Sequence, residues 1–113
     1  MKNDSSKINS LLIQEIVKRI LSVISPDKII FFGSYIYGKP HLDSDIDIIV
    51  IKSDIKSKIE EYRKIRKSLK GLKYPFDIIV ISPEEFNFYS LRWQNSVIAE
   101  ANEKGKIVYE RNS

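Results

Sequence analysis

The sequence predicts an α/β (α+β) domain in which helices pack on a small mixed β-sheet. Two observations predict this class: helical and strand-like apolar patterns alternate along the chain, and the strand-like runs are short and rich in β-branched residues. At 113 residues, with no repeat or Pro/Gly/Ser-rich linker, the chain has room for one core. We therefore expect a single domain over residues 1–113, with residues 1–6 as a flexible polar N-terminus.

The first predicted helix is amphipathic and ends before a proline. Its apolar residues recur at the spacing of one helix face: Ile8, Leu11, Leu12, Ile16, Ile20, Val23 and Ile24. Pro26 disfavours helical geometry in the residue before it, so the helix ends near Ser25. Lys28–Phe32 is β-branched and aromatic, which predicts a strand. Residues 33–44 contain two glycines and a proline, and predict a loop or turn.

The middle of the chain repeats this alternation. Residues 46–51 are almost continuously apolar, as in a strand covered on both faces. A second amphipathic helix, ending near Gly71, carries a stripe in which Tyr62 is expected in the core: Ile55, Ile59, Tyr62, Ile65 and Leu69. Residues 76–81 predict another strand.

The C-terminal part predicts two helices and a last strand. Ser82 is a candidate N-cap, and Glu85 completes a capping box around a proline at the first helical position. A short helix over 97–104 stops at Gly105, a residue typical of the position after a helix end. Residues 106–109 predict the final strand.

The charge is unevenly distributed along the chain. The net charge is +4, from 19 basic and 15 acidic residues. Between positions 52 and 73 the chain has three acidic residues and nine basic ones: Lys52, Lys56, Lys58, Arg63, Lys64, Arg66, Lys67, Lys70 and Lys73. Such a basic run can attract a triphosphate, RNA or an acidic partner, but a solvated helix face is the explanation that we favour. Nucleic-acid binding is left open and not favoured.

The composition also excludes some kinds of site. Cysteine is absent, so there are no disulfides or thiolate metal sites, and no apolar run is long enough to span a bilayer. We therefore expect a cytoplasmic protein without a membrane partner, and leave homo-oligomer formation open.

Three aspartates stand where apolar strands begin. Asp45 and Asp47 are two residues apart at the start of strand 46–51, so alternation places both side chains on one face. Asp77 begins the next strand. If these strands pair side by side, three carboxylates converge at one end of the sheet. Carboxylates so placed repel each other, and a divalent cation such as Mg²⁺ would resolve that repulsion.

Gly33 and Ser34 strengthen the interpretation of these aspartates. An Asp-x-Asp pair or a Gly-Ser pair alone is more often a turn feature. Here Gly33 and Ser34 directly follow a strand, where glycine lets backbone N–H groups approach an anion and serine adds a hydroxyl donor. Ten residues separate them from Asp45 and Asp47. This combination is much less accidental than either pair.

The Gly33–Ser34 pair, ten residues and Asp45–Ile46–Asp47 resemble the signature of the polymerase-β-like nucleotidyltransferase superfamily. The surrounding segment IIFFGSYIYGKPHLDSDIDIIVI is similar to the minimal nucleotidyltransferase (MNT) family in particular. Members are small single domains, often the antitoxins of HEPN/MNT toxin–antitoxin pairs. The resemblance extends over most of the chain, through PFDIIVIS and VIAEANEKGKIVYE, and implies a polymerase-β palm-like fold.

The resemblance also implies a reaction, the Mg²⁺-dependent transfer of a nucleoside monophosphate, AMP from ATP, to an acceptor hydroxyl. Asp45 and Asp47 would ligate two Mg²⁺ ions. Asp77 would complete the ligand set of the metal that activates the acceptor, and could receive its proton. Catalysis by these three residues would come from positioning and charge neutralisation in an in-line displacement.

The implied nucleotide-binding residues depart from the family at one place. Gly33 and Ser34 would hold the terminal phosphates of the triphosphate. Many relatives carry Arg or Lys shortly after this pair, where this chain has Tyr35 and Tyr37. Lys39 is the nearest cation and would serve the phosphates as a point charge.

Within the MNT family the expected acceptor is a tyrosine of the cognate HEPN toxin, which AMPylation silences. The alternative is an MNT-fold antitoxin with little or no catalysis, which neutralises its partner by binding alone. The tyrosines after Gly33–Ser34 favour this alternative, and the intact set of aspartates opposes it. A phosphohydrolase with an aspartyl nucleophile is disfavoured, because its nucleophile would stand where Gly33–Ser34 ends the first strand.

Several other residues invite functional interpretations. His41, the only histidine, is interpreted as a solvated loop residue rather than a general base. Trp93, the only tryptophan, suits a partner anchor and a local core residue equally. Tyr35 and Tyr37 can stack on a base, but we expect them to pack the loop.

Overall fold

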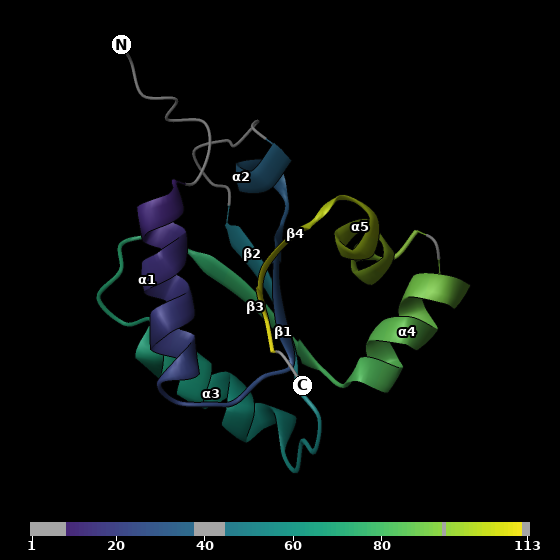
Figure 1. Cartoon of the computed structure of the whole chain (residues 1–113), viewed down its shortest axis with the longest axis horizontal. Helices are drawn as coiled ribbons and strands as arrows, with labels where there is room; N and C mark the ends of the chain where they lie inside the picture. Colours follow the sequence, from purple (N-terminus) through teal and green to yellow (C-terminus); the bar gives the residue numbers. More distant parts are fainter. Residues whose placement is uncertain (1–8, 38–44, 94, 112–113) are drawn as a thin grey trace.

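A computed structural model describes residues 9–37, 45–93 and 95–111 of the chain. At its centre is a mixed sheet in the order β3-β2-β1-β4 (Figure 1). The strands are β1 (Lys28–Phe32), β2 (Ile46–Ile51), β3 (Phe76–Ile81) and β4 (Lys106–Glu110). Strands β2 and β3 pair in parallel, and β1 pairs antiparallel with both β2 and β4. The predicted α+β class is confirmed.

Helices cover both faces of this sheet. Helices α1 (Ser10–Leu21) and α3 (Lys58–Ser68) pack on one side, called the α1/α3 face. Helices α4 (Pro83–Arg92) and α5 (Val97–Lys104) pack on the other, the α4/α5 face (Figure 1). Alternate apolar residues of β2 join the two cores, which confirms that this strand is covered on both sides. No helix within the described ranges is long and apolar enough to cross a membrane.

Helix α1 is shorter than its apolar stripe. It begins after Asn9, whose side chain accepts a hydrogen bond from the first turn, and it ends at Leu21. Ile24 is buried although it lies beyond the helix end, so the stripe continues into the following turn. Ile8 and the N-terminal residues 1–6 lie outside the described residues.

Two expectations for the middle of the chain are wrong. Residues 34–37 were expected in a loop, but they form the short helix α2 (Ser34–Tyr37) directly after β1. Tyr62 was expected in the core, but it is 39% exposed. The reason is the rotation of α3, which turns Glu61 and Ile65 inward at a spacing of four residues and leaves Tyr62 at the side.

The predicted helix ends on the α4/α5 face are confirmed in part. The Glu85 N–H donates to Ser82 Oγ (3.1 Å) and the Ser82 N–H donates to the Glu85 carboxylate (2.9 Å), which is the predicted capping box. Gly105 does end α5, but its backbone is extended (φ −72°) and not left-handed. A side chain there would clash with the Ala101 carbonyl oxygen, so close packing requires this glycine.

Candidate active site

Asp47 and Asp77 lie side by side where two paired strands begin. In the parallel ladder between β2 and β3, each is the register partner of the other. Neighbouring strands are about 4.8 Å apart, so the two carboxylates share one small region. The Ile46 N–H donates to the Pro75 carbonyl oxygen (2.9 Å), which fixes the register at the first residues of the pair. The strand pairing expected from the sequence is confirmed.

Both carboxylates belong to the α4/α5 face. Their neighbours along β2 and β3 are part of the α1/α3 core, and strand alternation turns Asp47 and Asp77 to the other side. Asp45 directly precedes β2 and is exposed. The apolar core of the α4/α5 face begins further along β2, at Ile49. The aspartates therefore form the polar end of that face.

The carboxylate of Asp47 carries an electrostatic cost. Its pKa is raised from 3.8 to about 6, first by burial and then by the negative charges of Asp77 and Asp45. Glu100, on helix α5, adds a smaller effect in the same direction. A partly buried carboxylate among other carboxylates is a costly arrangement, and a bound cation would relieve it.

Gly33 directly follows β1 and lies next to Asp47. Phe32 is the register partner of Asp47 in the antiparallel ladder between β1 and β2, so the next residue continues past the carboxylate. The backbone of Gly33 has φ +89°, a conformation that favours glycine. A Cβ atom at this position would clash with Asp47 Oδ2 and lie 3.0 Å from its Cγ. Glycine is therefore required both by conformation and by space.

The match to known sequences decides the family. A model of the nucleotidyltransferase domain matches residues 12–108, nearly the whole chain. The chain belongs to this family. The matched range contains Gly33, which follows β1, and the paired aspartates Asp47 and Asp77.

The nucleotidyltransferase domain is also similar to solved structures. A toxin–antitoxin structure with AMP-PNP is 25% identical, with a TM-score of 0.63 over 88% of this chain and 74% of that chain. A tri-AMPylated Shewanella oneidensis HEPN toxin in complex with an MNT antitoxin is 24% identical, with a TM-score of 0.60 over 92% of this chain and 74% of that chain. The toxin–antitoxin structure MntA–HepT is 22% identical, with a TM-score of 0.59 over 91% of this chain and 74% of that chain. Among curated proteins, the comparison finds no match.

Most of the predicted site residues come together at one end of the sheet: Gly33, Asp45, Asp47 and Asp77. Ser34 is the first residue of α2, directly after Gly33. Lys39, predicted to contact the phosphates, and His41 lie outside the described residues. The predicted site residues that the structure describes therefore lie close together at one end of the sheet.

Glu100 was not predicted from the sequence. It lies in α5, which packs across β1, and its charge reaches Asp47. The available signal was an acidic residue next to the apolar positions Ile98 and Ala101 of a predicted helix. That pattern does not say which end of the sheet the helix approaches.

Two aromatic residues are now placed. Tyr35 packs against the α1/α3 core, as expected for a residue that holds its segment to the domain. Trp93 is 59% exposed and touches Tyr89 edge-on at a centroid distance of 5.3 Å. This exposure does not support the core interpretation of Trp93, and the partner-anchor interpretation stays a prediction.

The donor chemistry of the site fits a hard divalent cation. Within the described residues, no group of three or more His, Cys, Asp or Glu side chains is already arranged to hold a metal ion. The aspartates nevertheless supply the carboxylate oxygens that Mg²⁺ prefers, and their mutual repulsion is the kind that a cation removes. Asp45, Asp47 and Asp77 are therefore suitable candidates to hold Mg²⁺ together with a triphosphate.

Proposed function

We propose that this domain is a Mg²⁺-dependent protein adenylyltransferase that transfers AMP from ATP to a tyrosine of a cognate HEPN toxin, and so acts as an antitoxin. The observation that carries the proposal is the register pairing of Asp47 with Asp77 beside Gly33. The similar structures support the nucleotide and the partner, since one contains AMP-PNP and another an AMPylated HEPN toxin.

Each residue has a distinct role in the proposed reaction. Asp45 and Asp47 would hold Mg²⁺, which neutralises the triphosphate and lowers the pKa of the attacking hydroxyl when bound. Gly33 and Ser34 would bind the terminal phosphates through backbone N–H groups and a hydroxyl. Asp77 would join the ligand set of the metal nearest the acceptor and would accept the proton from the acceptor hydroxyl. The new bond joins the acceptor oxygen to the α-phosphorus, and the bond from that phosphorus to pyrophosphate breaks.

The proposed role of Asp77 can be tested directly. Purified Asp77→Asn protein, mixed with ATP, Mg²⁺ and the toxin, is expected to lose at least about a hundredfold in transfer rate, because it lacks both a metal ligand and the receiver of the acceptor proton. Intact-mass spectrometry of the toxin measures the added AMP. Asp54→Asn is the matched control, since Asp54 is exposed and its φ of 59° is a conformation that asparagine tolerates. Undiminished transfer by Asp77→Asn would contradict the assignment.

The second candidate is neutralisation by binding alone. It is favoured by Tyr35, which stands where many members of the resembled family have a cation and which packs against the α1/α3 core. Intact-mass measurement of a toxin co-expressed with this domain separates the two functions. An inhibited toxin of unmodified mass would support binding alone, whereas added AMP on an inhibited toxin supports the transferase.

A further inference from the structure

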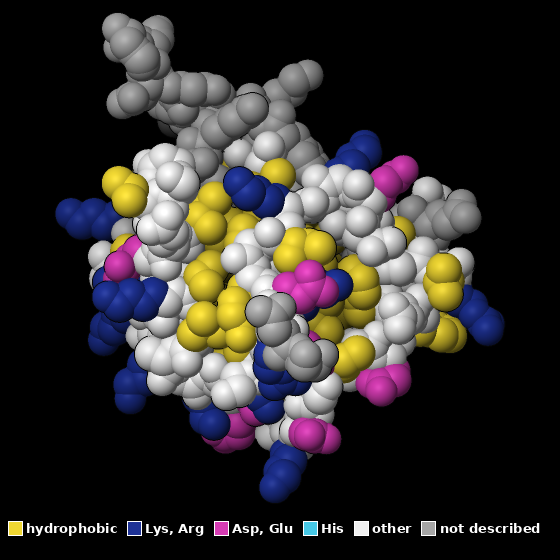
Figure 2. All heavy atoms as spheres, viewed as in Figure 1, with side chains coloured by type: hydrophobic (Ala, Val, Ile, Leu, Met, Phe, Trp, Pro, Cys, Tyr) yellow, Lys and Arg dark blue, Asp and Glu magenta, His cyan; other side chains and the backbone are white. Residues whose placement is uncertain are grey.

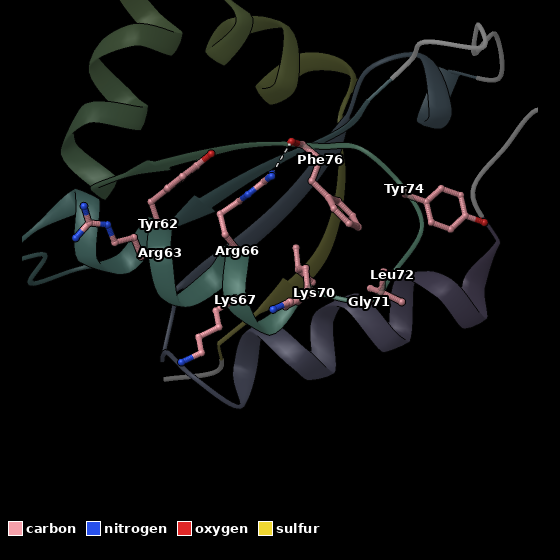
Figure 3. Close-up of a pocket in the computed structure, with 10 residues that line it drawn as sticks. Tyr62, Arg63, Arg66, Lys67, Lys70, Gly71, Leu72, Tyr74 and Phe76 are labelled. Atoms are coloured by element: carbon pink, nitrogen blue, oxygen red, sulfur yellow. Dashed lines mark hydrogen bonds between the residues drawn. The ribbon is translucent and has the colours of Figure 1, made fainter.

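A pocket lies between helix α3 and the segment that leads into β3. Its volume is about 480 Å³. Figure 3 shows Arg66 extending from α3 to the carbonyl oxygen of Phe76, while Leu72 and Tyr74 stand on the connecting segment. The hydrogen bond from Arg66 to Phe76 measures 2.9 Å. The pocket is therefore closed on one side by a helix and on another by the chain that leads into β3.

The lining of the pocket is basic. It includes four cationic side chains and no carboxylate: Arg63, Arg66, Lys67 and Lys70. Arg66 is engaged with Phe76, and Arg63 lies 3.7 Å from Glu60 on its own helix. Lys67 and Lys70 have no ion-pair partner within the residues that the structure describes. Two cations at this pocket are thus available for an anionic ligand.

The pocket also has apolar walls. They include Leu69, which is buried, Leu72 and Phe76, which are partly buried, and Tyr74, which is 41% exposed. Apolar and aromatic surface ringed by lysines suits a ligand that combines carboxylates with an apolar side chain. A nucleic-acid backbone would instead favour cations spread along a track. The composition of the pocket therefore favours an acidic protein segment.

The position of the pocket relates it to the active site. Phe76 lines the pocket, and Asp77 is the next residue of the same strand. Strand alternation turns Phe76 to the α1/α3 face and Asp77 to the α4/α5 face. Because β3 is an edge strand, a partner seated in the pocket can continue around that edge to Asp77. Adjacent residues of a strand are only about 3.3 Å apart along its axis.

We propose that this basic pocket docks an acidic segment of the acceptor protein, with an apolar side chain against Leu69 and Leu72 and carboxylates at Lys67 and Lys70. Docking brings the acceptor hydroxyl around the β3 edge to Asp77. This inference rests on the proposed transfer to a protein acceptor, and it assigns a function to part of the basic run that would otherwise be only a solvated helix face.

Charge reversal tests the docking site. The Lys67→Glu/Lys70→Glu protein is compared with Lys56→Glu/Lys64→Glu, which has the same net charge and changes two exposed lysines that do not line the pocket. Affinity for the purified HEPN toxin is measured by calorimetry without nucleotide. The pocket variant is expected to bind at least about tenfold more weakly, with a smaller salt dependence, and the control to bind nearly as wild type.

Several results would overturn docking at this pocket. These are equal losses in the two variants, no loss in either, no toxin binding by the wild-type protein, or a loss of binding to a short single-stranded RNA with toxin binding retained. Circular dichroism of both variants checks folding, and Lys67→Gln/Lys70→Gln, which removes the charges without reversing them, is expected to give an intermediate loss. Pocket-dependent docking with no AMP transfer would support this site while refuting the transferase.

Discussion

Two oppositely charged regions meet at the beginning of β3, and they differ in the free-energy cost of holding their charges in the folded protein. The acidic region, Asp45, Asp47 and Asp77, includes a partly buried carboxylate whose pKa is raised to about 6. The basic pocket holds exposed cations, of which Arg66 is satisfied by a backbone carbonyl. Exposed cations on a helix are inexpensive, whereas like charges crowded at a partly buried strand end are not.

This difference in electrostatic cost determines how strongly each region indicates a function. An arrangement that opposes folding persists only if something else requires it, and perturbed carboxylates gather at functional sites for that reason. The acidic region therefore points to a cation and a chemical role on physical grounds. The basic pocket is also compatible with a solvated surface, so its role depends on its apolar walls, its place beside Asp77 and the docking experiment.

The largest expected effect comes from breaking the close approach within the acidic region. Gly33→Ala places a Cβ atom against Asp47 Oδ2 and also forces alanine into a left-handed conformation. We expect a loss of about 2–4 kcal/mol in the free energy of unfolding, from overpacking and conformational strain together. Transfer of AMP is expected to fall at least about a hundredfold, because Asp47 is displaced.

Gly71 offers a matched control for Gly33→Ala. It too has a positive φ, of 97°, but a Cβ atom there meets nothing within 4 Å. Gly71→Ala should therefore show only the conformational strain, about 1 kcal/mol in the free energy of unfolding. Thermal unfolding compares the two variants, and intact-mass spectrometry measures the transfer by Gly33→Ala. If both variants lost the same stability, the contact between Gly33 and Asp47 would not be what requires glycine.

The acidic region was largely predictable from the sequence because its parts are local. Asp45 and Asp47 are two residues apart, and alternation along a strand puts them on one face without any tertiary information. Asp77 required one assumption, that two apolar strands pair, and the register confirms it. The family resemblance then supplied roles for these residues that their spacing alone does not contain.

Other features depended on packing that the sequence does not specify. Glu100 approaches Asp47 only because α5 crosses the sheet at that end. Residues 34–37 carry glycine and proline signals nearby, which hid the single turn of α2. Tyr62 fitted an apolar stripe, but the rotation of α3 decides which of its faces is buried. The pocket unites α3 with residues up to Phe76, so it exists only in the folded chain.

The hydrogen bond from Arg66 to the Phe76 carbonyl is the physical link between the two regions. It holds the first residue of β3, directly before Asp77. Arg66→Ala is expected to reduce the rate of AMP transfer about tenfold through misplacement of Asp77, with a smaller change in ATP affinity. Single-turnover kinetics at saturating ATP separate the two quantities.

Lys64→Ala is the control for this link. Lys64 is exposed on the same helix and does not line the pocket. Arg66→Lys keeps a donor on the same side chain and should recover part of the rate. Similar losses in Lys64→Ala and Arg66→Ala, or an effect on ATP affinity alone, would mean that the hydrogen bond from Arg66 to Phe76 does not position Asp77.

The smallest expected effect is a gain in stability at the cost of activity. In the metal-free protein, Asp47→Asn removes a carboxylate disfavoured by burial and by its acidic neighbours, and should raise the free energy of unfolding by roughly 1 kcal/mol after solvent screening. Because the native pKa of Asp47 is raised, the native state holds more protons between pH 3.8 and about 6, and wild-type stability falls as pH rises through that window. The advantage of Asp47→Asn should therefore be small at the acidic end and complete above pH 6. Unfolding temperatures in chelator across this range measure it, and an advantage independent of pH would show that the carboxylate charge is not the cost that distinguishes the acidic region from the basic pocket.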